Sequence, residues 1–297
     1  VDPSVSKIRP FVTGIIARNG IINDEIIKQL MNMQEDLHFG IGRKRKKSSI
    51  GLHDLDKISF PLNYTTSTRE HSFVPLNSES MNTIDEILSE TDVGRDYGWI
   101  LNESKNIPII LDSEGKTISF PPIINGALTT ITTKTKNIFV EVTSLDKDAA
   151  EDMLSIVVAI LHMAGFEMSQ LTISGAKNST PKLNSKIIQY DIKLTEQILG
   201  INLSPSAMVS SLKKCRLDAI QKGKRIQCTI PRHRFDIFGP MDIVEEIALG
   251  YGIENLEPKL SPSSTLGEKS LKTEKLEIIS RTALGLGFTE ALNSSLT

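Results

Sequence analysis

Cysteine, tryptophan and long apolar runs are scarce in this sequence, and each shortage excludes a class of protein. With only two cysteines, Cys215 and Cys228, the chain can form neither a disulfide framework nor a four-cysteine zinc site. We expect buried thiols in a reducing compartment. No stretch approaches the roughly 18 continuous apolar residues of a membrane helix, and Val1-Asp2-Pro3 does not open a secretion signal. The sequence therefore predicts a cytoplasmic protein with no membrane partner.

An excess of charge of one sign is also missing. The formal net charge is −2 over 297 residues, whereas dedicated nucleic-acid binders usually carry a basic balance. We therefore expect no DNA partner, and any contact with RNA must come from a local patch. The length predicts two domains or slightly more.

Residues 1–175 have the pattern of a domain that mixes strands and helices. A helix is expected after the cap Asn23, and a second begins at Asp146 or Asp148 and closes at Gly165. Thr83 and Glu86 form a capping-box pattern at the start of a short helix. Strands are expected at 11–17, 107–111, 117–120, 129–135, 138–143 and 166–173. This arrangement predicts an α+β fold.

A segment rich in Gly, Asn, Ser, Thr and Pro, residues 175–184, predicts a domain boundary. We place a second, smaller α+β domain at 176–258, with two short helices that resemble a helix-turn-helix arrangement. Its expected elements are helices at 195–199, from Ser204 and near Asp242, and a strand at 225–230. Residues 259–297 are expected to hold a linker to 271, a helix at 273–286 and the start of a truncated domain. Both ends of the chain are interpreted as internal positions of a longer protein.

The only extreme charge run is Arg43, Lys44, Arg45, Lys46 and Lys47. Five adjacent cations repel one another, so they require either a polyanion such as RNA or full solvation. Charge alone does not decide between a phosphate-binding patch and a solvated loop.

The densest acidic cluster is Asp236, Asp242, Glu245 and Glu246. Four carboxylates that converge on one turn repel unless a cation lies among them, which favours a metal such as Mg²⁺. Alternatively, Asp242 caps a helix with Glu245 completing the box, while Arg232 and Arg234 neutralise the rest.

Motifs of nucleophilic catalysis are absent: the sequence has no Gly-x-Ser-x-Gly elbow, no phosphate-binding loop and no Gly-x-Gly-x-x-Gly. Of the five histidines only His53 lies near carboxylates, Asp54 and Asp56. It has no second histidine at a metal-binding spacing, which favours a structural role over zinc.

Three stretches resemble the beta subunit of phenylalanyl-tRNA synthetase of the archaeal and eukaryal type. The first is Gly42 to Lys47 with Ile50-Gly-Leu-His-Asp-Leu-Asp56. The second is Ser119-Phe-Pro-Pro-Ile-Ile-Asn125 with Asn137-Ile-Phe-Val-Glu-Val-Thr143. The third is Pro231-Arg-His-Arg-Phe-Asp236 with Asp242-Ile-Val-Glu-Glu246. In addition, Gly285 to Glu290 looks like the opening of the family's catalytically inactive domain.

The resemblance implies a heterotetramer of two alpha and two beta subunits that charges tRNA with phenylalanine at the expense of ATP. The alpha subunit holds the sites for ATP, phenylalanine and the tRNA end, so ATP binds the assembled enzyme and not this chain. The first domain here resembles the tRNA editing domain, which hydrolyses tyrosine wrongly attached to the phenylalanine tRNA. Such editing is needed because an apolar pocket rejects an added hydroxyl by only about a hundredfold.

The resemblance also assigns residues. It points to Glu141 and Thr143 as catalytic in editing, and to Ile110 and Ser119 as substrate-binding. The family more often has leucine and aspartate where this chain has Ile110 and Glu141. It further implies that Asp236, Asp242, Glu245 and Glu246 bind Mg²⁺ shared with the alpha subunit, and the basic run 43–47 is a candidate for binding tRNA. Catalysis by positioning and electrostatics is expected, because no Ser-His or Cys-His pair is visible.

Two other functions stay open. The chain could be a non-catalytic module that binds tRNA or another subunit through the helix-turn-helix-like unit and the basic run. It could also be a metal-dependent hydrolase centred on residues 236–246, whose activity would then be sensitive to chelators and survive loss of residues 1–175.

Overall fold

The computed structural model describes residues 1–102, 104–174, 179–258 and 267–292. These residues form two compact units, Val1–Ile253 and Glu254–Thr297. The linker expected at 259–271 falls mostly outside the described residues, and so does part of the boundary expected at 175–184. The fold class is α+β, as predicted.

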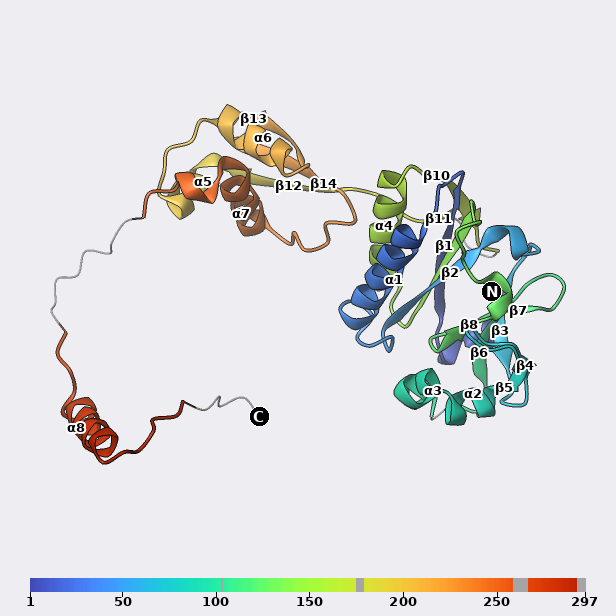
Figure 1. Ribbon diagram of the computed structural model, residues 1–297. Coiled ribbons are helices and arrows are strands. Elements are labelled where there is room, and N and C mark those ends of the chain that lie inside the picture. Colours follow the sequence, from blue (N-terminus) through green and yellow to red (C-terminus); the bar gives the residue numbers. More distant parts are fainter. Residues whose placement is uncertain (103, 175–178, 259–266, 293–297) are drawn as a thin grey trace. The chain divides into compact units, whose positions relative to one another are not determined.

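The central element of the first unit is an antiparallel sheet of five strands in the order β11-β10-β1-β9-β2. Its strands are β1 (Phe11–Arg18), β2 (Ser48–Asp54), β9 (Ile138–Ser144), β10 (Glu167–Thr172) and β11 (Ser179–Thr180). Two long helices, α1 (Asp24–Phe39) and α4 (Lys147–Met163), lie against this sheet (Figure 1). They begin at the predicted caps: the Asn23 side chain accepts from the amide of Ile26, and the Asp146 side chain from that of Ala149.

Alternation along β9 sends its side chains to two different environments. Ile138, Val140 and Val142 join the apolar core that α1 and α4 cover. The residues between them, Glu141 and Thr143 among them, point to the other face. The sheet thus has an apolar face toward the helices and a buried polar face opposite.

A second sheet, in the order β3-β6-β7-β8, contacts that polar face. Its strands are β3 (Asn63–Ser67), β6 (Ile107–Leu111), β7 (Thr117–Phe120) and β8 (Ile124–Asn125). Smaller elements flank it: β4 (Ser72–Phe73), β5 (Asn82–Thr83), α2 (Ile84–Glu90) and α3 (Asp92–Tyr97). The predicted capping box of Thr83 and Glu86 is present at α2. Single 3-10 turns lie at Pro3–Lys7, Leu55–Lys57, Gly98–Leu101 and Ala127–Thr129.

The strand predicted at 129–135 is wrong, because its threonines bond to nearby backbone. The Thr135 hydroxyl accepts from the amide of Thr132, and the Thr132 hydroxyl accepts from the amide of Lys134. Thr135 also donates to Asp54 Oδ2 at 2.8 Å. These local bonds replace the ladder of a sheet.

The remainder of the unit has its own three-stranded sheet, in the order β12-β14-β13, and its own core. Its elements are β12 (Lys186–Asp191), α5 (Ile192–Leu199), α6 (Pro205–Lys214), β13 (Asp218–Lys222), β14 (Arg225–Ile230) and α7 (Pro240–Tyr251), followed by a 3-10 turn at Ile253–Asn255. Helix α6 packs closely against α7. Cys228 is buried, Cys215 is half-buried, and both are free thiols. The second compact unit contains α8 (Leu271–Gly285).

Candidate functional site

Glu141 is a buried carboxylate, 2% exposed, in the middle of strand β9. Its neighbours across the sheet are glycines on both sides, Gly14 of β1 and Gly51 of β2. A Cβ on Gly51 would lie 2.5 Å from Glu141 Oε1, and one on Gly14 would lie 2.7 Å from the carbonyl oxygen of Val140. The register therefore keeps free the space that this carboxylate needs.

The predicted pair of Ser119 and Glu141 does meet. Ser119 of β7 donates from Oγ to Glu141 Oε1 at 3.0 Å, and so joins the two sheets. Ser119 Oγ also lies 3.2 Å from Oδ1 of Asn125. Residues that are 22 positions apart in the sequence thus share one polar contact.

His53 completes this cluster, although the sequence favoured a structural role for it. It is fully buried, it stacks on Phe139 with ring centroids 5.8 Å apart, and its Nδ1 lies 2.8 Å from Thr129 Oγ1. Its Nε2 lies 4.0 Å from Glu141 Oε1. Within the described residues, neither this Nε2 nor Glu141 Oε2 has a hydrogen-bond partner. Two buried polar atoms without a partner, on side chains that approach to 4.0 Å, mark a position where a polar atom of a bound molecule would be stabilised.

Glu141 lines two hollows. The larger, about 720 Å³, is also lined by Ser119, Asn125 and Arg45. The smaller, about 200 Å³, has Ile110 and aromatic rings in its wall. The rings are those of Phe60, Tyr64 and Phe139. Ile110 pairs with Ser119 across β6 and β7, so two of the residues that the resemblance points to lie near the carboxylate of a third, Glu141.

Thr143 is placed differently: it is fully buried and lines neither hollow. The buried guanidinium of Arg9 donates to Thr143 Oγ1 and to its carbonyl oxygen, each at 2.8 Å. Ser49 Oγ lies 3.0 Å from the same hydroxyl. Arg9 also donates to the carbonyl oxygens of Lys46 and Arg45 at 3.0 and 3.2 Å. The hydroxyl of Thr143 is thus committed to the interior, behind the carboxylate.

Burial lowers the pKa of Arg9 to about 10, because it disfavours the charged guanidinium. Electrostatic interactions with Tyr64 and Glu141 oppose the lowering of the Arg9 pKa. Tyr64 donates from its hydroxyl to the carbonyl oxygen of Arg9 at 2.7 Å, and burial raises its own pKa. The arrangement places a permanent positive charge under the polar face of the sheet.

The basic run forms a tight turn between α1 and β2. Arg43, Lys44 and Arg45 have φ angles of 48°, 53° and 66°, the left-handed region that costs non-glycine residues about 1 kcal/mol or more each. Arg9 stabilises the turn through its hydrogen bonds to the carbonyl oxygens of Arg45 and Lys46. Arg45 donates to the carbonyl oxygen of Ile123 at 2.9 Å and stacks over Tyr97. This part of the run is structural.

The other cations of the run differ in their surroundings. Lys47 pairs with Asp146 at 3.5 Å. Lys46 lies over the ring of Trp99 and Lys44 over that of Phe39, both on exposed side chains. Arg43, Lys44 and Lys46 are therefore the members of the run that face solvent.

Arg45 also anchors an ion cluster on α1. It donates to Glu35 Oε1 at 2.7 Å, and His38 Nδ1 lies 3.4 Å from the same oxygen. His38 Nε2 accepts from the amide of Ile50, so Nδ1 carries the proton and donates. The His38 hydrogen bond lowers the pKa of Glu35 to about 2, with Arg45 contributing and burial opposing.

This shift sets a pH dependence. The folded pKa of Glu35 lies below its ordinary value of 4.5, so its stabilisation is complete above about pH 4.5 and is lost as the pH falls toward 2. We expect Glu35→Gln to be less stable than the wild type at neutral pH, and the gap to close below pH 4.5. Urea unfolding at a series of pH values measures this. Glu25→Gln, exposed on the same helix, is the control, and an equal gap at every pH would refute the assignment.

The four predicted magnesium ligands do not converge. Asp242 Oδ2 accepts from the amides of Phe238 and Gly239, each at 2.8 Å, at the start of α7. The helix begins at Pro240, so Asp242 is its third residue and bonds back to the amide of the cap Gly239 instead of serving as the cap itself. Asp236 and Glu246 both bond to Arg234. Glu245 is exposed.

Arg232 pairs with Asp152 and Asp148 of α4, so it does not neutralise the cluster. No group of three or more His, Cys, Asp or Glu suited to a metal occurs among the residues that the structure describes, and this applies equally to His53. The side chains as they lie do not fit a magnesium ion held by this chain.

Two domain families match the chain. Residues 22–153 match the B3/4 domain, and residues 188–253 match the tRNA synthetase B5 domain. The phenylalanine–tRNA ligase beta subunit of Archaeoglobus fulgidus is 35% identical over all of this chain, and that of Methanocaldococcus jannaschii is 36% identical over 98% of it. Over nearly all of its length, the chain is similar to phenylalanyl-tRNA synthetase beta subunits. It spans about half the length of the curated relatives that it matches, 54% of each of these two.

A solved structure agrees with this assignment. An N-terminal fragment of the phenylalanyl-tRNA synthetase beta subunit from Pyrococcus horikoshii superposes with a TM-score of 0.80 at 28% identity. The match covers 84% of this chain and 73% of that one. The B3/4 match includes Glu141, Ser119 and His53, and the B5 match includes the acidic cluster of α7. None of the helices in the described residues is long and apolar enough to span a bilayer.

Proposed function

We propose that the cleft around Glu141 hydrolyses the ester of tyrosine wrongly attached to the phenylalanine tRNA. The observation that carries the proposal is the buried carboxylate itself. Glu141 lines two hollows, accepts from Ser119 and has one unsatisfied oxygen, and His53, with an unsatisfied nitrogen, approaches the same carboxylate to 4.0 Å. A fold without a polar ligand gains nothing from this arrangement, because an unpaired buried carboxylate destabilises it.

The two hollows suit the two halves of an aminoacyl ester. The smaller one is walled by Phe60, Tyr64 and Phe139, which pack well against an aromatic ring. The larger one has the hydrogen-bonding side chains of Ser119 and Asn125 in its wall, and suits the ribose and base at the tRNA end. Ile110 lines the smaller hollow, which fits its expected role in substrate binding.

Hydrolysis needs a water molecule held against the ester carbonyl. Water oxygen bonds to the carbonyl carbon, the carbon–oxygen bond to the ribose breaks, and the proton ends on the ribose hydroxyl. Thr129 donates to the carbonyl oxygen of Gly126 and accepts from His53 Nδ1, which leaves Nε2 with a free lone pair. We assign to His53 Nε2 and Glu141 Oε2 the holding of that water or of the substrate amine. Thr143 acts behind them, by fixing β9 through Arg9.

The roles proposed for the rest of the chain rest on its similarity to phenylalanyl-tRNA synthetase beta subunits. The tRNA would contact Arg43, Lys44 and Lys46, whose charges face solvent at the rim of the first domain. In the assembled cytoplasmic enzyme the alpha subunit would supply the site for ATP and phenylalanine, in a tetramer of two alpha and two beta subunits. The magnesium site of Asp236, Asp242, Glu245 and Glu246 stays a prediction for that assembly, and no step is routed through it.

The proposal is tested by incubating the chain with phenylalanine tRNA that carries either tyrosine or phenylalanine. We expect release of tyrosine to be about tenfold faster than release of phenylalanine or more, because a site with polar groups for the phenol hydroxyl favours the substrate that carries it. Equal and background rates for both, together with retained tRNA binding, would instead favour the non-catalytic binding module. Chelator-sensitive hydrolysis that survives loss of residues 1–175 would favour the metal hydrolase.

A further inference from the structure

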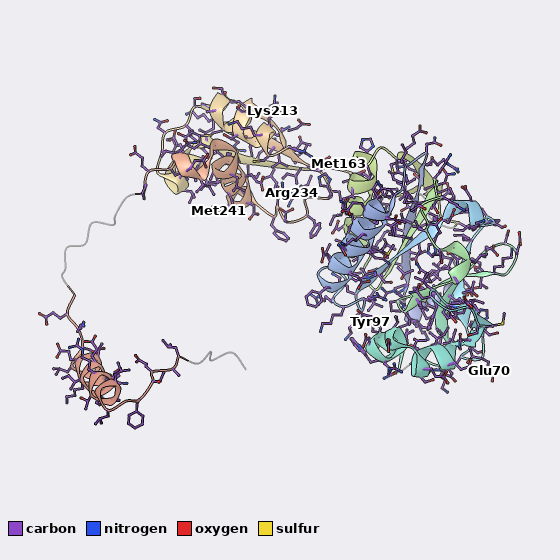
Figure 2. The ribbon with its side chains drawn as sticks, in the orientation of Figure 1. Glu70, Tyr97, Met163, Lys213, Arg234 and Met241 are labelled. Atoms are coloured by element: carbon purple, nitrogen blue, oxygen red, sulfur yellow. The ribbon has the colours of Figure 1, made fainter. Side chains whose placement is uncertain are left out.

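The acidic cluster before and on α7 contains a cation of its own, the guanidinium of Arg234. Arg234 lies on the loop that leads into α7, and Met241 marks the first turn of the helix (Figure 2). Its Nε lies 3.0 and 3.1 Å from the two oxygens of Asp236, and its Nη2 lies 2.8 Å from Asp236 Oδ2. Its Nη2 and Nη1 lie 2.5 and 3.4 Å from the two oxygens of Glu246. One side chain thus bonds to all four oxygens of two carboxylates.

Burial explains why this cation is needed. The Glu246 side chain is only 13% exposed, and that of Arg234 is 25% exposed. A carboxylate removed from water to that extent requires a partner charge. The planar fork of arginine matches two carboxylates at once, whereas a lysine ammonium is a point charge. These hydrogen bonds raise the pKa of Arg234 further, so it stays charged.

The same oxygens are the ones that a divalent cation would need. Magnesium demands short, near-octahedral bonds to carboxylate oxygens. Here the oxygens of Asp236 and Glu246 already accept from the guanidinium of Arg234. Asp242 is committed to two backbone amides, and Glu245 points to solvent. We propose that Arg234 is the resident counter-cation of this cluster and keeps divalent cations out of it in this chain. The inference is independent of the editing function.

The test is a titration of the 297-residue chain with Mg²⁺ and, separately, Ca²⁺, by calorimetry and by thermal unfolding. The wild type is expected to show no saturable binding at Asp236 and Glu246. Arg234→Met is expected to gain a saturable site, about tenfold tighter or more than any wild-type binding, because two unpaired carboxylates then seek a cation. The added cation should also raise its melting temperature.

Three further variants make the result decisive. Arg234→Lys keeps the charge and is expected to gain no site. Arg232→Met removes an arginine from the same loop whose partners are Asp148 and Asp152, and is expected to behave as the wild type. Adding Glu246→Gln to Arg234→Met should abolish the new site. Should Arg234→Met fail to fold, the same comparison of cation binding is made between Arg234→Gln and the wild type.

Two results would overturn the proposal. One is saturable Mg²⁺ binding by the wild type that Asp236→Asn removes. The other is a folded neutral variant at position 234 that binds no more tightly than Arg232→Met.

Discussion

Replacing Glu141 by glutamine is expected to slow hydrolysis of tyrosine from its tRNA by about a hundredfold or more, without loss of stability. The rate falls because the charge that holds the water or amine is gone, and removal of one well-placed catalytic group typically costs this much. Stability is preserved because the glutamine oxygen still accepts from Ser119, while the cost of a buried and half-satisfied carboxylate disappears.

The matched control is Glu151→Gln. Glu151 is a second buried glutamate, on α4, and it accepts from the backbone amide of Lys182 at 2.8 Å. This variant is expected to hydrolyse at the wild-type rate. Single-turnover deacylation and urea unfolding measure the two properties. A Glu141→Gln protein that is unstable yet hydrolyses normally when folded would mean that Glu141 is a structural residue.

Replacing Arg9 by methionine is expected to lower the free energy of unfolding by about 3–5 kcal/mol, the largest effect on stability that we predict. The change leaves buried acceptors unpaired, namely the carbonyl oxygens of Thr143, Arg45 and Lys46. It also releases the left-handed turn of the basic run, whose φ angles Arg9 helps to maintain.

The control for Arg9→Met is a second arginine, Arg18, on the strand that follows Arg9 in the chain. Arg18 is exposed at the end of β1, and Arg18→Met is expected to change the unfolding free energy by less than about 0.5 kcal/mol. Urea unfolding at neutral pH compares the two. If both variants are equally stable, Arg9 does not hold the turn and the strand together.

Capping residues and apolar periodicity, which are local features of the sequence, predicted the two long helices and α2. Asn23, Asp146 and Thr83 are short polar residues followed by apolar periodicity, and each caps the helix that was predicted from it. Such caps depend on neighbours within four residues, so the sequence contains them fully.

The strands required longer-range information. Strand β3 was not among the strands expected from the sequence, yet it pairs with β6 about 45 residues away in the chain. The opposite error at 129–135 has the same origin, since β-branched threonines can bond to a turn as readily as they fit a sheet.

The residues of the candidate site also fall into two groups, those that the sequence predicted and those that depend on long-range pairing. Resemblance to the family pointed to Ser119, Glu141 and Ile110, and Ser119 and Ile110 lie near the Glu141 carboxylate, while their roles in editing stay a prediction. His53, Arg9 and the two glycines could not be assigned, because their roles depend on the register of β1 and β2 against β9. A lone arginine in an otherwise apolar stretch, Ile8-Arg9-Pro10-Phe11, was the only available signal for Arg9.

The most direct measurement is a crystal structure of this chain with tyrosine joined through a stable amide to the 3′ position of adenosine. The account predicts the phenol ring in the smaller hollow against Phe139, and a polar atom of the ligand or a water within hydrogen-bonding distance of both Glu141 and His53. Tyrosine bound elsewhere, with the space beside Glu141 closed by repacked side chains, would contradict it.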